Sequence, residues 1–199
     1  MTEQQRIHKA LAAIIKATEA SSAKWILGGS ASLMLRGLDL ASEPRDLDIY
    51  CDDEDMYALY EALKPFAIDE PEFSVTDIYR SRLCHFQIEN VQVELVGGFQ
   101  VSAGGSSYRT MVRELLIPYS ESVSLAGSGL TAALVPLAHE LWFNYLRDRK
   151  DRVELIVEAF ANLFSKHVDA LHAIEASNTL ADDTKGSLHQ LISAKKVGG

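Results

Sequence analysis

The sequence predicts an α/β fold followed by a helical region, and three patterns lead to this expectation. Short apolar runs bounded by glycine or polar residues, such as residues 25–27, are typical of buried strands. Amphipathic segments with helical spacing alternate with these runs and are typical of helices that cover a sheet. From Pro136 onward the spacing is helical. We therefore expect an α/β domain over residues 1–135 and a helical region packed on it over residues 136–199.

The composition is that of a globular protein with a core, since 47% of the 199 residues are hydrophobic. The formal net charge of −9 disfavours non-specific binding to nucleic acid, although a local basic patch could still bind RNA. Cys51 and Cys84 lie in strand-like runs and form no CxxC pair, so we expect small, buried, reduced thiols. The polar N-terminus and the lack of a run of ~20 apolar residues predict a cytoplasmic protein without a membrane span.

The first elements are a helix, a strand and a second helix. Residues 4–21 have one apolar stripe and are expected to form an amphipathic helix. A strand is expected over residues 24–27. After two glycines and a serine, the second helix is expected to run to Arg36, with Gly37 as its C-terminal cap.

The turn Gly28-Gly29-Ser30 joins the first strand to the second helix. Glycine lets backbone N–H groups approach an anion closely, and the start of a helix adds a favourable dipole. Ser30 is expected either to cap the helix or to bond a phosphate oxygen. The turn therefore indicates an anion site.

Two aspartates lie on the next predicted strand, residues 46–51. Alternate residues of a strand share a face, so Asp46, Asp48 and Tyr50 should point one way. The other three residues should point into the core: Leu47, Ile49 and Cys51. Neighbouring carboxylates repel each other, and a divalent cation relieves that repulsion. Because Mg²⁺ favours one or two carboxylates together with water and substrate phosphates, the pair indicates a magnesium site.

The two motifs together resemble the signature of the nucleotidyltransferase superfamily of the DNA polymerase beta type. That signature is a Gly-Gly-Ser/Thr turn followed by Asp-x-Asp on the next strand, here residues 28–30 and 46–48. The resemblance is sharpest over residues 24–50. It is closest to bacterial abortive-infection and toxin-type nucleotidyltransferases, in which an arginine or threonine often precedes the first aspartate, as Arg45 does here. It implies a mixed β-sheet flanked by helices.

Further elements are expected between this motif and residue 135. The acidic run 52–55 is expected to open a helix over 56–63, where acids complement the helix dipole. Residues 97–107 are glycine-rich and are expected to be a linker or mobile lid, because they lack the lysine and the following helix of a phosphate-binding loop. Six strands or extended segments are predicted: 73–79, 83–89, 91–96, 111–118, 123–125 and 130–135.

Glu94 lies on the strand predicted over 91–96, in the place where the family carries a third acid, usually aspartate. The resemblance implies that Glu94 either ligates a second metal or takes the proton of the acceptor. The implied catalytic and metal-binding set is therefore Asp46, Asp48 and Glu94, with two Mg²⁺ ions.

The densest basic cluster of the chain, residues 147–152, is expected at the C-terminal end of a helix that begins near Pro136. Lys150-Asp151 resembles a basic residue followed by aspartate in the family. Arg149 and Lys150 are therefore implied as nucleotide contacts, with Arg147 as a further candidate. A helix over 151–166 and one or two helices over 168–194 are expected to follow.

The function implied is a Mg²⁺-dependent transfer of a nucleoside monophosphate from a nucleoside triphosphate, such as ATP, to an acceptor. Gly28, Gly29 and Ser30 would contact the β- and γ-phosphates, and Arg45 would orient the strand end or meet a phosphate. The toxin-like resemblance favours tRNA or protein over a small molecule as acceptor. Three alternatives stay open: a catalytically inactive member of the family acting through a protein partner, an antitoxin-like or regulatory protein, and a plain α/β scaffold.

Overall fold

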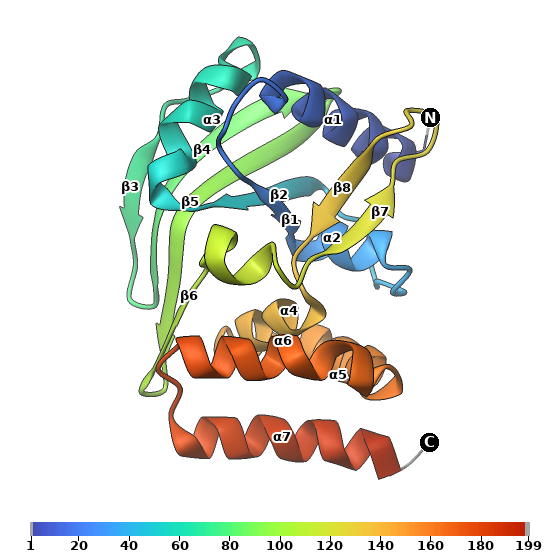
Figure 1. The fold of residues 1–199 in the computed structure, drawn as a ribbon, viewed down its shortest axis with the longest axis vertical. Helices are drawn as coiled ribbons and strands as arrows, with labels where there is room; N and C mark the ends of the chain where they lie inside the picture. The colour runs from blue at the N-terminus through green and yellow to red at the C-terminus, as the bar shows by residue number, and fades with distance from the viewer. Residues whose placement is uncertain (1, 198–199) are drawn as a thin grey trace. The chain divides into compact units, whose positions relative to one another are not determined.

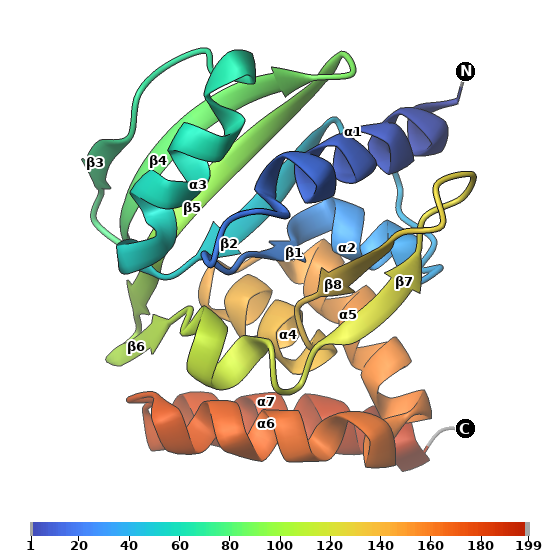
Figure 2. The same ribbon diagram turned by 45° about the horizontal axis from the view of Figure 1, so that its top comes forward.

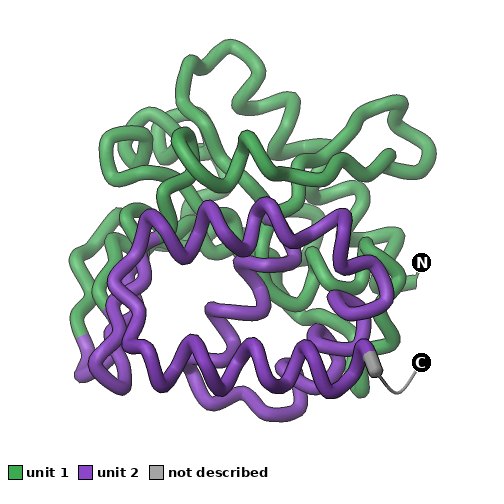
Figure 3. Tube along the Cα trace, turned by 60° about the horizontal axis from the view of Figure 1, so that its bottom comes forward, with its two compact units in different colours: residues 1–75, 80–99, 110–135 green, residues 76–79, 100–109, 136–199 purple. Residues whose placement is uncertain are grey.

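The computed structural model describes residues 2–197 and divides the chain into two compact units (Figures 1 and 3). Unit 1 comprises residues 1–75, 80–99 and 110–135. Unit 2 comprises residues 76–79, 100–109 and 136–199. The last point at which the chain passes from one unit to the other is therefore residue 135, and unit 2 also takes two short stretches from earlier in the chain.

Unit 1 is built on a mixed sheet with the strand order β3-β4-β5-β2-β1-β8-β7. These strands are β1 (Ile26–Gly28), β2 (Asp46–Cys51), β3 (Glu72–Val75), β4 (Tyr79–Ile88), β5 (Val91–Ala103), β7 (Glu121–Ser124) and β8 (Thr131–Leu134). The central strand β2 runs antiparallel to β1 and parallel to β5, and β1 runs parallel to β8. The expected mixed sheet flanked by helices is confirmed.

Helices α1 (Glu3–Thr18) and α3 (Met56–Leu63) lie side by side over one face of this sheet (Figures 1 and 2). Thr2 begins α1 with a capping box, since its hydroxyl accepts from the N–H of Gln5 and the Gln5 side chain accepts from the N–H of Thr2. The helix ends at Thr18, three residues before the predicted end. The apolar stripes of both helices pack on the strands to form the core of unit 1.

Alternation along β2 sets the two faces of the sheet. Leu47, Ile49 and Cys51 are fully buried in the core under α1 and α3. Asp46 and Asp48 are only partly buried, and with Tyr50 they point to the opposite face. The predicted alternation is therefore confirmed.

The prediction that residues 97–107 form a linker or lid is wrong. β5 continues through Gly97 and Gly98 to Ala103, and β6 (Ser106–Arg109) pairs back onto its end in unit 2. A Cβ at Gly97 would lie 3.0 Å from the sulfur of Met56, so this glycine lets α3 pack closely on the strand. The glycines here permit close packing within a strand, and Gly104-Gly105 provides the turn.

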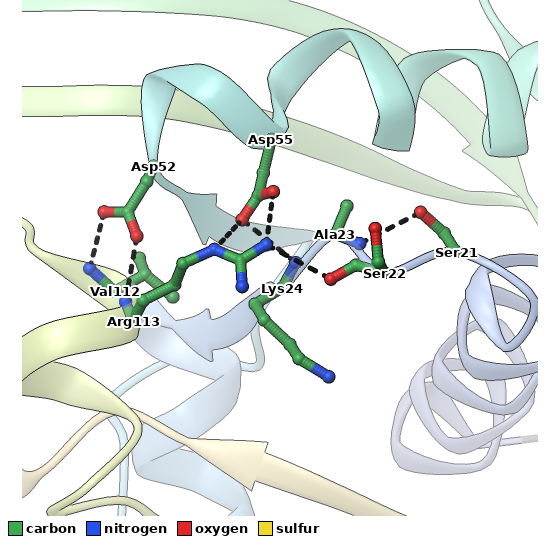
Figure 4. Close-up of polar contacts among 8 residues, drawn as sticks. All are labelled: Ser21, Ser22, Ala23, Lys24, Asp52, Asp55, Val112 and Arg113. Carbon is green, nitrogen blue, oxygen red and sulfur yellow. Dashed lines mark hydrogen bonds and ion pairs between the residues drawn. The ribbon is translucent and has the colours of Figure 1, made fainter.

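The prediction of an extended segment over residues 111–118 is also wrong, because residues Val112–Leu116 form a π-helix, η3. The carboxylate of Asp52 accepts hydrogen bonds from the backbone N–H groups of Val112 and Arg113, at 2.8 and 2.9 Å. The carboxylate of Asp55 accepts from Nε and Nη2 of Arg113 at 2.7 and 2.6 Å, and from the N–H of Lys24 at 3.1 Å (Figure 4). The acidic run therefore fixes distant segments instead of only opening a helix.

Unit 2 contains the predicted helical region. Its helices are α4 (Leu137–Leu146), α5 (Lys150–Asn162), α6 (Phe164–Ser177) and α7 (Asp182–Val197). Trp142, Phe143 and Phe160 are buried between them. Tyr108 from β6 is also buried, and its hydroxyl lies 2.7 Å from Nδ1 of His139. Burial, reinforced by Glu140, raises the pKa of Tyr108, so this tyrosine stays protonated.

None of the helices in residues 2–197 combines the length and the apolar character that crossing a bilayer requires.

The buried carboxylate of Asp55 gives a prediction about stability. Asp55→Ala should lower the free energy of unfolding by about 2–4 kcal/mol, because it leaves the Lys24 N–H and the Arg113 guanidinium without their acceptor. Asp53→Ala is the matched control from the same turn: its side chain is 61% exposed and forms an ion pair with Arg82, at 3.3 Å. The control should cost less than about 1 kcal/mol. Equal losses in urea unfolding would contradict the role of Asp55.

The two cysteines give a prediction about reactivity. Both thiols are buried as expected; burial raises the pKa of Cys84 to about 12, and burial followed by the charge of Asp55 raises the pKa of Cys51. Because the thiolate is the nucleophile, iodoacetamide at pH 8 should add to neither cysteine of the folded protein. Mass spectrometry should find two adducts once the protein is unfolded in urea. Modification of the folded protein would show that these strands open readily.

Candidate active site

A row of polar positions crosses the sheet of unit 1. Gly28 at the end of β1 lies opposite Asp48 of β2, and Asp48 lies opposite Glu94 of β5. Directly paired positions on neighbouring strands have Cβ atoms ~5 Å apart and side chains on the same face. The structure therefore brings together the glycine turn, one aspartate of the pair and the third acid. The first and last of these, Gly28 and Glu94, are 66 residues apart in the sequence.

The two glycines of the turn lie directly against side chains of β2. A Cβ on Gly28 would come within 2.1 Å of the ring of Tyr50, and a Cβ on Gly29 would come within 1.9 Å of Oδ2 of Asp48. Gly29 also has φ +66°, a left-handed conformation. The Asp48 carboxylate can take its position only because residue 29 has no side chain.

Helix α2 (Gly29–Leu35) starts earlier than predicted, and Gly28 is its N-cap. No side chain caps this end, so Ser30, which lies inside the first turn, is not the capping residue. The alternative, that Ser30 bonds a phosphate, stays a prediction. The helix ends at Leu35 with Arg36 as its C-cap, one residue before the predicted end, and Gly37 follows with φ +83° and donates to the carbonyl of Met34 at 2.8 Å.

Asp46 and Arg45 lie at the start of β2. Asp46 pairs with Gln92 of β5, one strand period away from the Asp48–Glu94 pair, and shares the face of Asp48. Arg45 is exposed. Two roles were predicted for Arg45, which are to orient the end of the strand or to meet a phosphate, and both stay predictions.

Glu94 has a neighbour that the sequence motifs did not indicate. Nε2 of His85 on β4 lies 3.8 Å from Oε1 of Glu94. On its other side, His85 is held by Asp69, which accepts from the backbone N–H and contacts Nδ1, both at 2.6 Å. A signal was present, because the tight turn at Glu89-Asn90 places residues at equal distances before and after it side by side. Counting back from that turn pairs His85 with Glu94.

The predicted metal ligands have suitable chemistry but do not form a closed cage. In the described residues 2–197, no three His, Cys, Asp or Glu side chains surround one point that an ion could occupy. Asp48 and Glu94 nonetheless offer oxygen donors from paired positions. Such a donor set fits Mg²⁺, which keeps waters and is bound by one or two carboxylates together with substrate phosphates.

Arg149 and Lys150 belong to unit 2, so the geometry of the polar row does not test them. The basic cluster lies at the junction of two helices: Arg147 is the C-cap of α4, as predicted, whereas Arg149 is the N-cap of α5 and Lys150 its first residue. Acids from the same segment lie beside them, with Asp148 4.0 Å from Lys150 and Asp151 3.8 Å from Arg149. These acids offset the unfavourable position of positive charge at the start of a helix.

Unit 2 also contains a cavity of about 850 Å³ that the sequence did not indicate. Residues of α5 and α7 line most of it, including Val153, Val157 and Leu191, and Lys150 and Asp148 are also among the lining residues. The cavity has the size of a small-molecule site. Nothing in its lining identifies a ligand.

Known proteins match this chain by structure and not by sequence. No family model and no curated protein matches it. A candidate nucleotidyltransferase from Thermotoga maritima has a TM-score of 0.60 at 21% identity, covering 75% of this chain and 90% of that chain. The antibiotic-resistance factor ANT(2″)-Ia (TM-score 0.47, 12% identity, 98% and 92% covered) and the lincosamide adenylyltransferase LnuA (0.44, 13%, 78% and 96%) are too distant to support an inference. The chain therefore has a nucleotidyltransferase fold.

The contact between Gly29 and Asp48 gives a prediction with an internal control. Gly29→Ala and Gly37→Ala both place alanine at positive φ, which costs about 1 kcal/mol at each position. Only the first substitution drives a Cβ into a neighbour, because nothing lies within 4 Å of a Cβ at Gly37. Gly29→Ala should therefore destabilise the protein by about 1–3 kcal/mol more than Gly37→Ala in thermal unfolding. Equal effects would mean that Asp48 moves away at little cost.

Proposed function

We propose that this protein transfers a nucleoside monophosphate from a nucleoside triphosphate to an acceptor hydroxyl and releases pyrophosphate. The observation that carries the proposal is the row of Gly28, Asp48 and Glu94 across three adjacent strands of a nucleotidyltransferase fold. A further support is that Asp48 lies directly against the glycine turn, where a side chain at residue 29 is excluded.

In this proposal Asp46 and Asp48 hold divalent metal at the triphosphate. A divalent cation bound there supplies charge neutralisation for the attacking and leaving oxygens of an in-line displacement. The two aspartates share one face of β2, which supports their acting together. Their carboxylates fix where the α-phosphate sits relative to the acceptor, so most of the rate enhancement comes from positioning and electrostatics.

The turn and the flanking cations are proposed to bind the phosphates. Backbone N–H groups of Gly28, Gly29 and Ser30 would contact the β- and γ-phosphates, and Arg45 would meet a phosphate or orient the end of β2. Arg149 and Lys150 are proposed as further nucleotide contacts. Their support is the resemblance of Lys150-Asp151 to the family motif and the density of positive charge over residues 147–152 in a protein of net charge −9.

Glu94 is proposed to act beside Asp48, either as a ligand of the second metal or as the group that takes the acceptor proton on a carboxylate oxygen. When the proton leaves the acceptor hydroxyl, its oxygen bonds the α-phosphorus. The bond from that phosphorus to the bridging oxygen breaks, and pyrophosphate keeps the electron pair. The acceptor is a hydroxyl of an RNA, a protein or a small molecule, with RNA or protein favoured by the toxin-like motif.

The proposal predicts metal-dependent binding of triphosphate. In calorimetric titrations of the four nucleoside triphosphates, the wild type should bind at least one only when Mg²⁺ is present. Asp46→Asn/Asp48→Asn should weaken that binding at least tenfold, because the substitutions remove the charges that hold the metal. Asp39→Asn is the matched control, since Asp39 is an exposed aspartate in the loop before β2, and it should bind like the wild type.

The same titration distinguishes the proposed enzyme from a catalytically inactive module. If no triphosphate binds with or without Mg²⁺, the proposed function is wrong, and a catalytically inactive module acting through a protein partner takes its place. Binding that persists unchanged in the double variant would place the nucleotide away from the aspartates.

A further inference from the structure

His85 and Asp69 form a defined pair next to the polar row. Asp69 follows the short helical turn η2 (Lys64–Phe66) and accepts through Oδ1 from the backbone N–H of His85 at 2.6 Å. Its Oδ2 lies 2.6 Å from Nδ1 of the imidazole. An ionised carboxylate only accepts hydrogen bonds, so this contact assigns the ring proton to Nδ1. The lone pair of the neutral ring is then on Nε2.

Nε2 of His85 is directed at Glu94. It lies 3.8 Å from Oε1, beyond hydrogen-bonding distance, and both side chains are partly exposed, at 26% and 29%. Two atoms that bind one metal ion at ~2.1 Å with tetrahedral angles are ~3.4 Å apart. The separation therefore requires only a small closure for both atoms to bind one ion.

A carboxylate bonded to the far nitrogen of an imidazole is the usual support of a metal-binding histidine, because it fixes both the tautomer and the ring orientation. Here that support is Asp69, and the ligand atoms it leads to are Nε2 of His85 and Oε1 of Glu94. We infer that His85 and Glu94 together bind a first-row transition-metal ion, with Asp69 as the residue that orients the imidazole. The inference deepens the proposed function, on which it rests for the use of the ion.

The ligand types determine which metal this site prefers. An all-oxygen set would favour Mg²⁺, whereas an imidazole nitrogen shifts the preference toward ions such as Co²⁺ or Zn²⁺. Two protein ligands leave positions for water and for substrate oxygens. Asp48, which pairs with Glu94 across β2 and β5, lies beside the site and can bind a neighbouring ion.

The test is a titration of the full chain with Co²⁺ alone, without nucleotide, followed by absorption and by NMR of the histidine rings. We expect Co²⁺ to bind at least tenfold more tightly than Mg²⁺ and to shift or broaden the His85 ring signals first. His85→Gln should weaken Co²⁺ binding at least tenfold, and Asp69→Asn should weaken it about tenfold through loss of orientation. Mg²⁺-dependent triphosphate binding should be much less affected by Asp69→Asn.

His189→Gln is the matched control. His189 also contacts a carboxylate, but its Nε2 is only 2.8 Å from Glu175 and is therefore already engaged, so this variant should bind Co²⁺ like the wild type. If His85→Gln does not fold, as judged by its melting temperature, the Co²⁺ affinities of Glu94→Gln and Asp69→Asn are compared with that of the wild type instead.

Equal Co²⁺ affinity in the wild type, His85→Gln and Glu94→Gln would overturn the inference, as would Co²⁺ effects confined to other histidines. Because no nucleotide is present, this failure is distinct from failure of the proposed function. If Co²⁺ binds at His85 but the protein binds no triphosphate, the inferred metal site is supported and the proposed enzymatic function is contradicted.

Discussion

The ion pair between Asp55 and Arg113 holds together segments of unit 1 that are distant in the sequence. Asp55 also accepts from the N–H of Lys24, two residues before β1, and Arg113 lies in the first turn of the π-helix that precedes β7. Its side chain further donates to the carbonyl of Ser22. The start of β1, and with it the path that leads to the glycine turn, is thus fixed by a buried carboxylate. The buried charge of Asp55 is stable here because its carboxylate has several hydrogen-bond partners, while the Arg113 side chain stays partly in contact with water.

Local pattern predicted most of the secondary structure and failed where a distant contact decides the conformation. Alternation along β2 was sufficient to separate Asp46 and Asp48 from the residues that face the core, because period 2 is a property of any strand. Residues 112–116 also contain apolar side chains but form a helix, and its first two N–H groups, those of Val112 and Arg113, are bonded to the distant Asp52. Likewise, the sequence around Gly97 is typical of a flexible linker. The strand has a glycine there because Met56 of α3 packs closely against it.

The candidate site was predictable in its residue types and not in its neighbours. Asp46, Asp48 and Glu94 could be identified because motif spacing and strand alternation are local. The partner of Glu94 depends on the register of the β4–β5 hairpin, which a single residue more or less in the turn would change. Glutamate has one methylene more than the aspartate usual at this position, so its carboxylate can reach farther toward the neighbouring strand, where His85 lies. The side chains of Glu94 and His85 therefore approach each other from neighbouring strands.

The burial of both native cysteines has a practical consequence. Cys51 and Cys84 are fully enclosed by the core of unit 1. A cysteine introduced at an exposed position is therefore the sole accessible thiol, and no native residue has to be replaced before a dye or spin label is attached. Lys64 on unit 1 and Asp151 on unit 2 are exposed positions for such labels. Each unit can thus be followed by its own probe in a protein whose core is otherwise unaltered.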